Sequence, residues 1–396
     1  MARFLCAWEL GVGLGHLASL APAARGLAAH GHEAWAALKD VAAARHMPDA
    51  PFARVLPAPL WLESRNVAPT HGYGALYADG GFADEDGLAA LVASWLALID
   101  LAQPAGIVAE HAPAALLAAH VARLPAVRIG TPFTCPPATR PLPMLQGWAA
   151  PAGLRPGAAD AVADRVVRNL CRQFGAPMLD GLAAMLATAP AHLVSWPEMA
   201  DGPRGDAVFH GPLHLGGGEA PEWPPGRLRI AVYLPHDRPM AAALRTALAG
   251  LDAAVLWVGA AAPAGLPQHM ACVPGGIDLP AALASADLFI SRGGHHGALE
   301  ALAAGCPQLI LPDTLEAETT ARTLAGQGLA RWTRDWRPEA LLPAIAALLA
   351  AGAPERFAAC AVAAAQAGHD PAAATRALGT ALLGVLLPID RSREGA

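Results

Sequence analysis

The sequence lacks paired cysteines. Its six cysteines are scattered over 396 residues and form no Cys-x-x-Cys pair. This spacing argues against the common zinc sites and against a disulfide-stapled scaffold, and it is typical of a protein kept in a reducing compartment. We therefore expect a cytoplasmic protein without a bound metal.

The sequence also has little charge and no excess of basic residues. Charged residues make up 15% of the chain, and the formal net charge is −6. A nucleic-acid-binding domain normally carries a basic surface, so we expect no nucleic-acid partner. Apolar residues make up 54%, which excludes a disordered chain and suffices for large cores.

No apolar run is long enough to span a bilayer. The longest, near residues 341–351, contains Pro343 and is too short to cross a membrane. Near the N-terminus, Glu9 interrupts the apolar residues before they reach the length of a signal peptide. We expect no transmembrane segment.

What the sequence does have is a repeated alternation of short apolar runs and helical patterns. The length favours two domains, and residues 196–226 are dense in Gly and Pro, as linkers are. We predict an α/β protein with an N-terminal domain over 1–195, a linker over 196–226 and a second domain over 227–370. A final helix and tail occupy 371–396.

The N-terminal half opens as a βαβ unit. A strand over 4–10 leads into the Gly-rich turn 11–16, a helix follows, and a second strand covers 32–38. Such a turn lies at the carboxyl edge of a parallel sheet, where α/β proteins bind ligands. Gly13 and Gly15 would let a phosphate approach this turn. His16 would face the ligand, although a solvated position beside the helix start is the alternative.

Two further candidates follow the strand at 106–109. Glu110 ends this strand, where it could cap the next helix. His111 is a weaker candidate for the same crevice. The irregular segment 56–83, rich in aromatics, either lines a pocket or packs its aromatic rings onto the domain.

The second half contains the most informative stretch. An apolar strand over 288–290 leads into a Gly-rich turn with Arg292 and two histidines, and a helix is expected from Ala298. Backbone N–H groups at a helix start, with cationic side chains beside them, form an anion site. A tight βα turn with incidental polar residues is the alternative.

The spacing downstream of this turn resembles the donor-binding signature of family 1 glycosyltransferases, which have the GT-B fold. The residues that match are Gly293, Gly294, Glu300, Gly305, Pro307, Pro312 and Glu316. The turn ending in His16 and the Val108-Ala109-Glu110 strand end are similar to motifs of that family as well. Three positions depart from it: Arg292 replaces a His, Gly297 a Ser or Thr, and Ala317 a Gln.

The resemblance implies two Rossmann-like, doubly wound domains facing a cleft, with the last helix returning to the N-terminal domain. The N-terminal domain would bind a small-molecule or peptide acceptor. The second would bind a UDP- or TDP-sugar as co-substrate, and no cofactor or metal would be needed. The implied reaction is an inverting sugar transfer.

The resemblance also implies roles for individual residues. His16 would be the general base and Glu110 its carboxylate partner. The nucleobase would lie near Gly275 and Gly276. Glu300 would bind the ribose hydroxyls, and Glu316 the sugar. The residues expected at the diphosphate are Arg292, Gly293, Gly294, His295 and Gly297.

Because Gly297 and Ala317 lack the family's functional groups, a second hypothesis remains open. The chain could be a non-catalytic GT-B protein that binds a nucleotide or a partner through a degenerate donor site. A sugar-nucleotide epimerase of the same fold is a weaker alternative.

Overall fold

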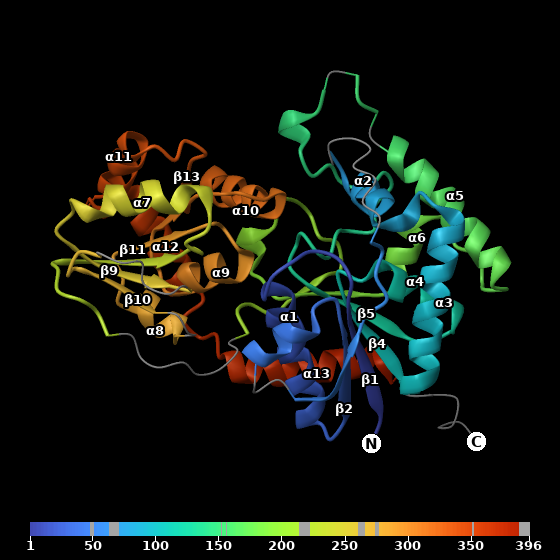
Figure 1. Cartoon of the computed structure of the whole chain (residues 1–396). Coiled ribbons are helices and arrows are strands. Elements are labelled where there is room, and N and C mark those ends of the chain that lie inside the picture. Colours follow the sequence, from blue (N-terminus) through green and yellow to red (C-terminus); the bar gives the residue numbers. More distant parts are fainter. Residues whose placement is uncertain are drawn as a thin grey trace. The chain divides into compact units, whose positions relative to one another are not determined.

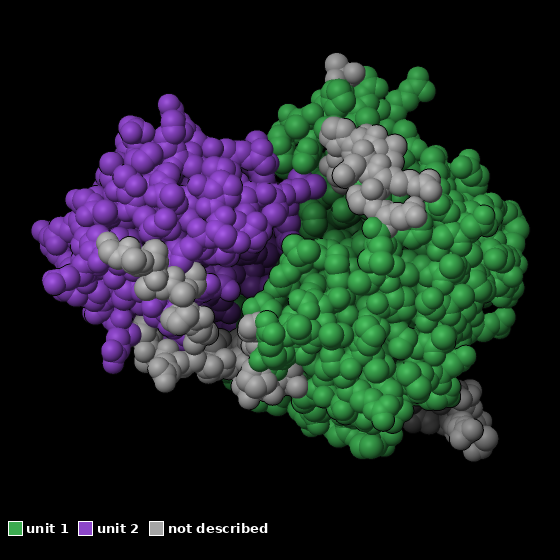
Figure 2. All heavy atoms as spheres, viewed as in Figure 1, with its two compact units in different colours: residues 1–195, 202–215, 370–396 green, residues 196–201, 216–369 purple. Residues whose placement is uncertain are grey.

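A computed structural model describes residues 1–47, 51–62, 71–151, 153–155, 157–213, 222–259, 266–273, 277–350 and 352–387. The chain forms two compact units, coloured separately in Figure 2. The first unit comprises Met1–Ser195, Gly202–Leu215 and Asp370–Ala396, and the second comprises Trp196–Asp201 and Gly216–His369. The segment predicted as a linker is thus divided between the two units.

The first unit is built on a seven-stranded parallel sheet in the order β3-β2-β1-β4-β5-β6-β7. Its strands β2, β1, β4 and β5 are labelled in Figure 1. All residues of β4 and β5 are buried, as expected for parallel strands covered on both faces. The strands are β1 (Arg3–Trp8), β2 (Glu33–Leu38), β3 (Phe52–Pro57), β4 (Gly106–Glu110), β5 (Ala126–Gly130), β6 (Ala191–Leu193) and β7 (Val208–Phe209).

Seven α-helices are described in this unit. Its core forms where the apolar stripe of the first helix, which includes Leu17, Leu20 and Leu27, packs against the buried side chains of β1. The helices are α1 (Gly15–Ala29), α2 (Tyr73–Tyr77), α3 (Glu85–Ala102), α4 (Pro113–Val121), α5 (Ala158–Gln173), α6 (Leu182–Ala187) and α13 (Pro371–Leu386).

The last helix, α13, lies beside α1 in the first unit (Figure 1). The two helices approach most closely at Gly26 and Gly379. A Cβ atom added to Gly26 would lie 2.7 Å from the carbonyl oxygen of Thr375 and 2.8 Å from the nitrogen of Gly379. Only glycine permits this backbone approach, so the C-terminal segment belongs to the core of the first unit.

The second unit contains a six-stranded parallel sheet in the order β10-β9-β8-β11-β12-β13. Its strands are β8 (Leu228–Tyr233), β9 (Ala253–Val258), β10 (Met270–Val273), β11 (Leu288–Ser291), β12 (Gln308–Ile310) and β13 (Ala330–Trp332). Its helices are α7 (Pro239–Ala249), α8 (Leu279–Ala284), α9 (His295–Ala303), α10 (Leu315–Gly326), α11 (Pro338–Leu349) and α12 (Pro354–Ala365). Each unit is therefore a doubly wound, Rossmann-like α/β fold.

Helices α5 and α6 are separated by residues 174–181, which contain Gly175, Pro177 and Gly181 and interrupt the helical conformation. One predicted helix boundary is wrong. The helix expected from Ala298 begins three residues earlier, at His295. Gly297 therefore lies inside its first turn.

Among the described residues, no single helix is both long and apolar enough to cross a membrane. Helices α11 and α12, which are bent relative to each other, reach this length and apolar composition only when they are taken together.

Candidate functional site

The candidate residues of the first unit gather where the strand order of its sheet reverses. Strands β1 and β4 are parallel neighbours, and Trp8 pairs with Glu110 at their carboxyl ends. From β1 the chain continues through α1 to β2, and from β4 it continues through α4 to β5. The two connections therefore run in opposite directions along the sheet. Doubly wound sheets bind their ligands at such a switch point.

At this point His16 and Glu110 contact each other directly. His16 Nδ1 lies 2.6 Å from Glu110 Oε2, and both side chains are buried. Because a carboxylate only accepts, we assign the proton to Nδ1, which leaves Nε2 as the ring nitrogen that can take up a proton. The Trp8 ring stacks on the imidazole, with centroids 4.8 Å apart. The imidazole is thus fixed in both orientation and tautomer.

The Gly-rich turn covers this imidazole. Gly11 and Gly13 have φ angles of +80° and +97°, which L-residues rarely adopt. A Cβ atom on Gly11 would collide with Nε2 of His16, whereas one on Gly13 would meet nothing within 4 Å. Gly13 is exposed, and Gly15, also exposed, is the first residue of α1. His16 is therefore a buried helical residue and does not occupy a solvated loop.

The role of Glu9 was not predicted from the sequence. Its carboxylate accepts hydrogen bonds from the backbone N–H groups of Ala114, at 3.0 Å, and Ala115, at 2.5 Å, in the first turn of α4. Burial raises the pKa of Glu9 to about 8, and these two bonds oppose the shift. Glu9, and not Glu110, therefore caps α4. An acidic residue directly after a buried strand was the available signal.

His111 lies next to the pair in an unusual backbone conformation, with φ at +44°. Its ring centroid is 6.0 Å from that of His16, and neither ring nitrogen has a hydrogen-bond partner among the described residues. Burial lowers the pKa of His111 to about 3, so the ring is neutral at physiological pH.

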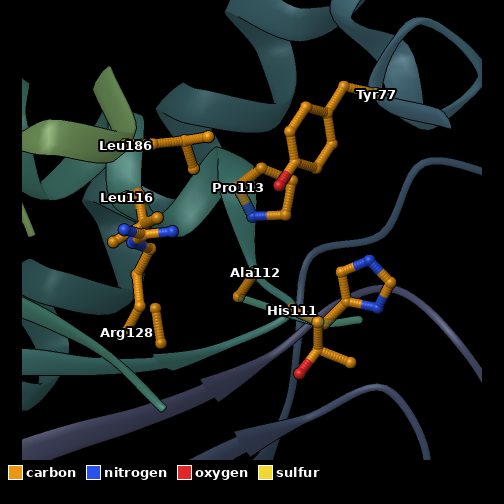
Figure 3. A pocket seen from close by; sticks show the side chains of 9 residues that line it. Tyr77, His111, Ala112, Pro113, Leu116, Arg128 and Leu186 are labelled. Atoms are coloured by element: carbon orange, nitrogen blue, oxygen red, sulfur yellow. The ribbon is translucent and has the colours of Figure 1, made fainter. Parts of the chain in front are cut away.

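A small cavity of about 10 Å³, room for roughly one water molecule, lies beside this loop. Figure 3 shows Tyr77, Leu116, Leu186 and Arg128 around it, with the His111 ring directed away from Arg128. Among the aromatics of segment 56–83, Tyr77 lines this cavity and Trp61 is half-buried. Tyr73 and Tyr77 are buried, and the Tyr73 hydroxyl donates to the carbonyl of Phe133. Residues 63–70 lie outside the described residues.

The second unit has its own switch point, between β8 and β11. The turn after β11 begins with Ser291, whose Oγ accepts from the backbone N–H of Gly293 at 3.1 Å. Gly293 has φ at +88°, and an added Cβ would lie 2.6 Å from Ile310 Cγ2. Gly294 is the N-cap of α9, and His295, buried, is its first residue. The predicted Gly-rich turn thus leads directly into a helix N-terminus.

Arg292 is held by a carboxylate of the neighbouring loop. Its Nε lies 3.0 Å from Oδ1 of Asp313, which follows β12, and a second guanidinium, that of Arg238 after β8, lies 3.5 Å from Oδ2. Asp287, a carboxylate closer to Arg292 in the sequence, lies instead beside Arg356 and accepts from the backbone N–H of Arg229.

The remaining candidates lie on helices of the second unit. Glu300 is on α9, where burial, reinforced by the charge of Asp278, raises its pKa to about 7. Glu316 is in the first turn of α10. Ala317 donates its backbone N–H to the Thr314 cap, and its Cβ packs against Gly293. Gly275 and Gly276 lie outside the described residues.

No group of three or more His, Cys, Asp or Glu side chains in the described part of the chain could hold a metal ion.

Neither a protein-family model nor a curated protein matches the sequence. Solved structures match it over nearly the whole chain. The glycosyltransferase VinC in complex with dTDP is 18% identical, with a TM-score of 0.69 over 96% of this chain and 100% of that one. The glycosyltransferase SnogD from Streptomyces nogalater is 23% identical, with a TM-score of 0.66 over 96% and 99%.

The spinosyn rhamnosyltransferase SpnG complexed with thymidine diphosphate is 18% identical, with a TM-score of 0.69 over 96% of this chain and 100% of that one. These likenesses show that the chain has the GT-B fold of glycosyltransferases. The fold class expected from the sequence is confirmed.

Proposed function

We propose that the chain is a glycosyltransferase that moves a sugar from a nucleoside-diphosphate sugar to an acceptor hydroxyl. The buried pair of His16 Nδ1 and Glu110 Oε2, 2.6 Å apart at a switch point, is the observation that carries this proposal. A protein that only binds a nucleotide has no need of an imidazole oriented in this way. The structural relatives VinC and SpnG were solved with TDP, which supports a nucleoside-diphosphate donor.

In the proposed reaction, His16 Nε2 removes the proton of the acceptor hydroxyl as the oxygen attacks the anomeric carbon. Glu110 stabilises the imidazolium that forms and keeps Nδ1 protonated. The bond between the anomeric carbon and the diphosphate oxygen breaks, and its electron pair leaves with the nucleoside diphosphate. Attack opposite the leaving group inverts the anomeric centre.

The second unit would hold the donor. Arg292 and the N-terminus of α9, at Gly294 and His295, would bind the diphosphate and stabilise its growing charge. This cationic surrounding makes a metal ion unnecessary. Gly293 would admit the phosphate to the backbone, Glu300 would accept from the ribose, and Glu316 would accept from the sugar.

A second candidate is a nucleotide-binding GT-B protein without catalysis. Two observations favour it: Gly297 offers no hydroxyl in the first turn of α9, and Ala317 offers no amide on α10. Under this alternative His16 would be replaceable without any effect on nucleotide binding or on donor breakdown.

The proposal is tested first by thermal unfolding in the presence of UDP, TDP, ADP and GDP. A ligand that binds only the folded state stabilises it, by about 2.7 kcal/mol at one hundred times its Kd. We expect UDP or TDP to raise Tm more than the corresponding nucleoside does. If none of the four diphosphates raises Tm, the chain is not a nucleoside-diphosphate-sugar enzyme.

A further inference from the structure

Three adjacent strands of the second unit bring an unusual cluster together. Strand β11 pairs with β8 through Ser291 and Tyr233 and with β12 through Ser291 and Ile310, so the three carboxyl ends are side by side. The loops that leave these ends carry Arg238, Arg292 and Asp313.

The cluster consists of two guanidinium groups on one carboxylate. The Asp313 side chain is nine-tenths buried, with 10% of its surface exposed. Arg292 Nε lies 3.0 Å from Oδ1, and Arg238 Nη1 lies 3.5 Å from Oδ2. A second carboxylate, that of Asp237, is 3.9 Å from Arg238 Nε, but it is 82% exposed and is therefore screened by water. One buried carboxylate is shared by two permanent cations.

The hydrogen bonds within this cluster are incomplete. Both Asp313 oxygens and Arg238 Nε are buried without a well-aligned hydrogen-bond partner among the described residues. Buried polar groups normally have such partners. The side chains of Arg292 and Arg238 keep 25% and 39% of their surface exposed. A ligand can therefore approach the two side chains from solvent.

The surrounding backbone favours an anion as this ligand. Arg238 is the residue directly before α7, and Arg292 stands two residues before the Gly294 cap of α9. Both helix N-termini and both guanidinium groups belong to the same edge of the sheet. Two planar cations are suited to two-point contacts with phosphate oxygens.

We propose that Arg238 is a diphosphate-binding residue, and that Asp313 holds Arg238 and Arg292 together as a two-guanidinium clamp for the diphosphate of the donor. The inference rests on the proposed function, because it specifies how the same donor would be held. It accounts for Gly297, since a second arginine replaces the hydroxyl that this position lacks. Asp313 acts as a positioning residue that keeps both side chains extended toward the ligand.

The test compares ligands with and without phosphate on matched variants of the full chain. Binding of TDP, UDP, thymidine and uridine is titrated by calorimetry on wild type, Arg238→Ala, Arg238→Lys and Arg245→Ala. Arg245 is the control, because it lies on α7 and contacts His236 Nδ1 instead of Asp313. Unfolding curves without ligand establish that each variant is folded.

We expect Arg238→Ala to weaken binding of the preferred diphosphate by about 10- to 150-fold, the range for a lost charge-assisted hydrogen bond. The nucleoside affinity of Arg238→Ala should stay near the wild-type value. The diphosphate affinity of Arg245→Ala should stay near the wild-type value as well. The diphosphate affinity of Arg238→Lys should lie between those of wild type and Arg238→Ala. Lysine keeps the positive charge but loses the planar guanidinium that can contact a phosphate at two points.

Three outcomes would overturn the inference. The first is an unchanged diphosphate affinity in Arg238→Ala. The second is an equal loss for nucleoside and diphosphate, which would indicate damage to the fold. The third is a wild-type protein that binds no diphosphate, and this result alone would also overturn the proposed function.

Discussion

The backbone of Gly11 lies against Nε2 of His16, the nitrogen assigned here as the proton acceptor. With φ at +80°, Gly11 is in a conformation that favours glycine, and the space beside its Cα is already filled by the imidazole. The Gly-rich turn therefore does two things: it reverses the chain after β1, and it defines the surroundings of the base.

This contact predicts that Gly11→Ala is far more damaging than Gly13→Ala. Both residues have positive φ, so each alanine variant should lose about 1–3 kcal/mol of stability from backbone strain. Only the Gly11 variant places a methyl group on the His16 ring. We expect it to lose turnover well beyond the loss in Gly13→Ala, as measured at equal folded concentrations. Equal activity in the two variants would mean that the turn does not control the imidazole.

The position of Gly297 predicts a gain of affinity. An added Cβ would meet only Phe289, at 3.7 Å, which is an ordinary contact. Gly297→Ser should therefore fold and place a hydroxyl in the first turn of α9. We expect TDP or UDP to bind about 10- to 150-fold more tightly, the value of one hydrogen bond to a charged group.

Gly297→Ala is the matched control for this gain, since it adds the same Cβ without the hydroxyl. If serine and alanine bind the diphosphate equally well, the first turn of α9 does not contact the phosphate.

The raised pKa of Glu300 predicts a pH dependence of nucleoside binding. The carboxyl is neutral below about pH 7, because burial and Asp278 disfavour its charge. A ribose hydroxyl donates better to the carboxylate, so affinity should increase as pH rises through about 7 and decrease as it falls. Between pH 8 and pH 6 we expect a loss of up to about tenfold.

Uridine and thymidine are the ligands to titrate, because they lack the phosphates that would themselves ionise in this range. Glu300→Gln should remove the pH dependence. If wild type and Glu300→Gln show the same pH dependence of nucleoside affinity, Glu300 does not bind the ribose. Comparison of UDP with its 2′-deoxy analogue shows which hydroxyl is bound: a preference for UDP of about 1.5–3 kcal/mol is expected if the 2′-hydroxyl donates to the carboxylate.

The sequence allowed the two α/β units and the His16 region to be predicted, because each depends on local patterns. Apolar runs locate strands, and a Gly-rich turn after a strand locates a switch point. The side-chain contacts that could not be predicted depend on which strands become neighbours in the sheet. Asp313 meets Arg292 only because β12 pairs with β11, and no spacing rule distinguishes it from Asp287. For the same reason, Glu9 was seen as an isolated charge although it caps a helix more than a hundred residues away.

The proposed function depends most on His16 as the general base, and one measurement tests this role directly. Wild type and His16→Ala are compared for sugar transfer from TDP-glucose or UDP-glucose to a panel of small hydroxylated acceptors, with the product detected by mass spectrometry. Glu110→Gln serves as the intermediate variant, since it keeps the shape and loses the charge. We predict that His16→Ala lowers turnover by about 10²–10⁴-fold while the Kd of the diphosphate is unchanged, and that Glu110→Gln lowers it less. A His16→Ala protein that transfers sugar at the wild-type rate would contradict the account.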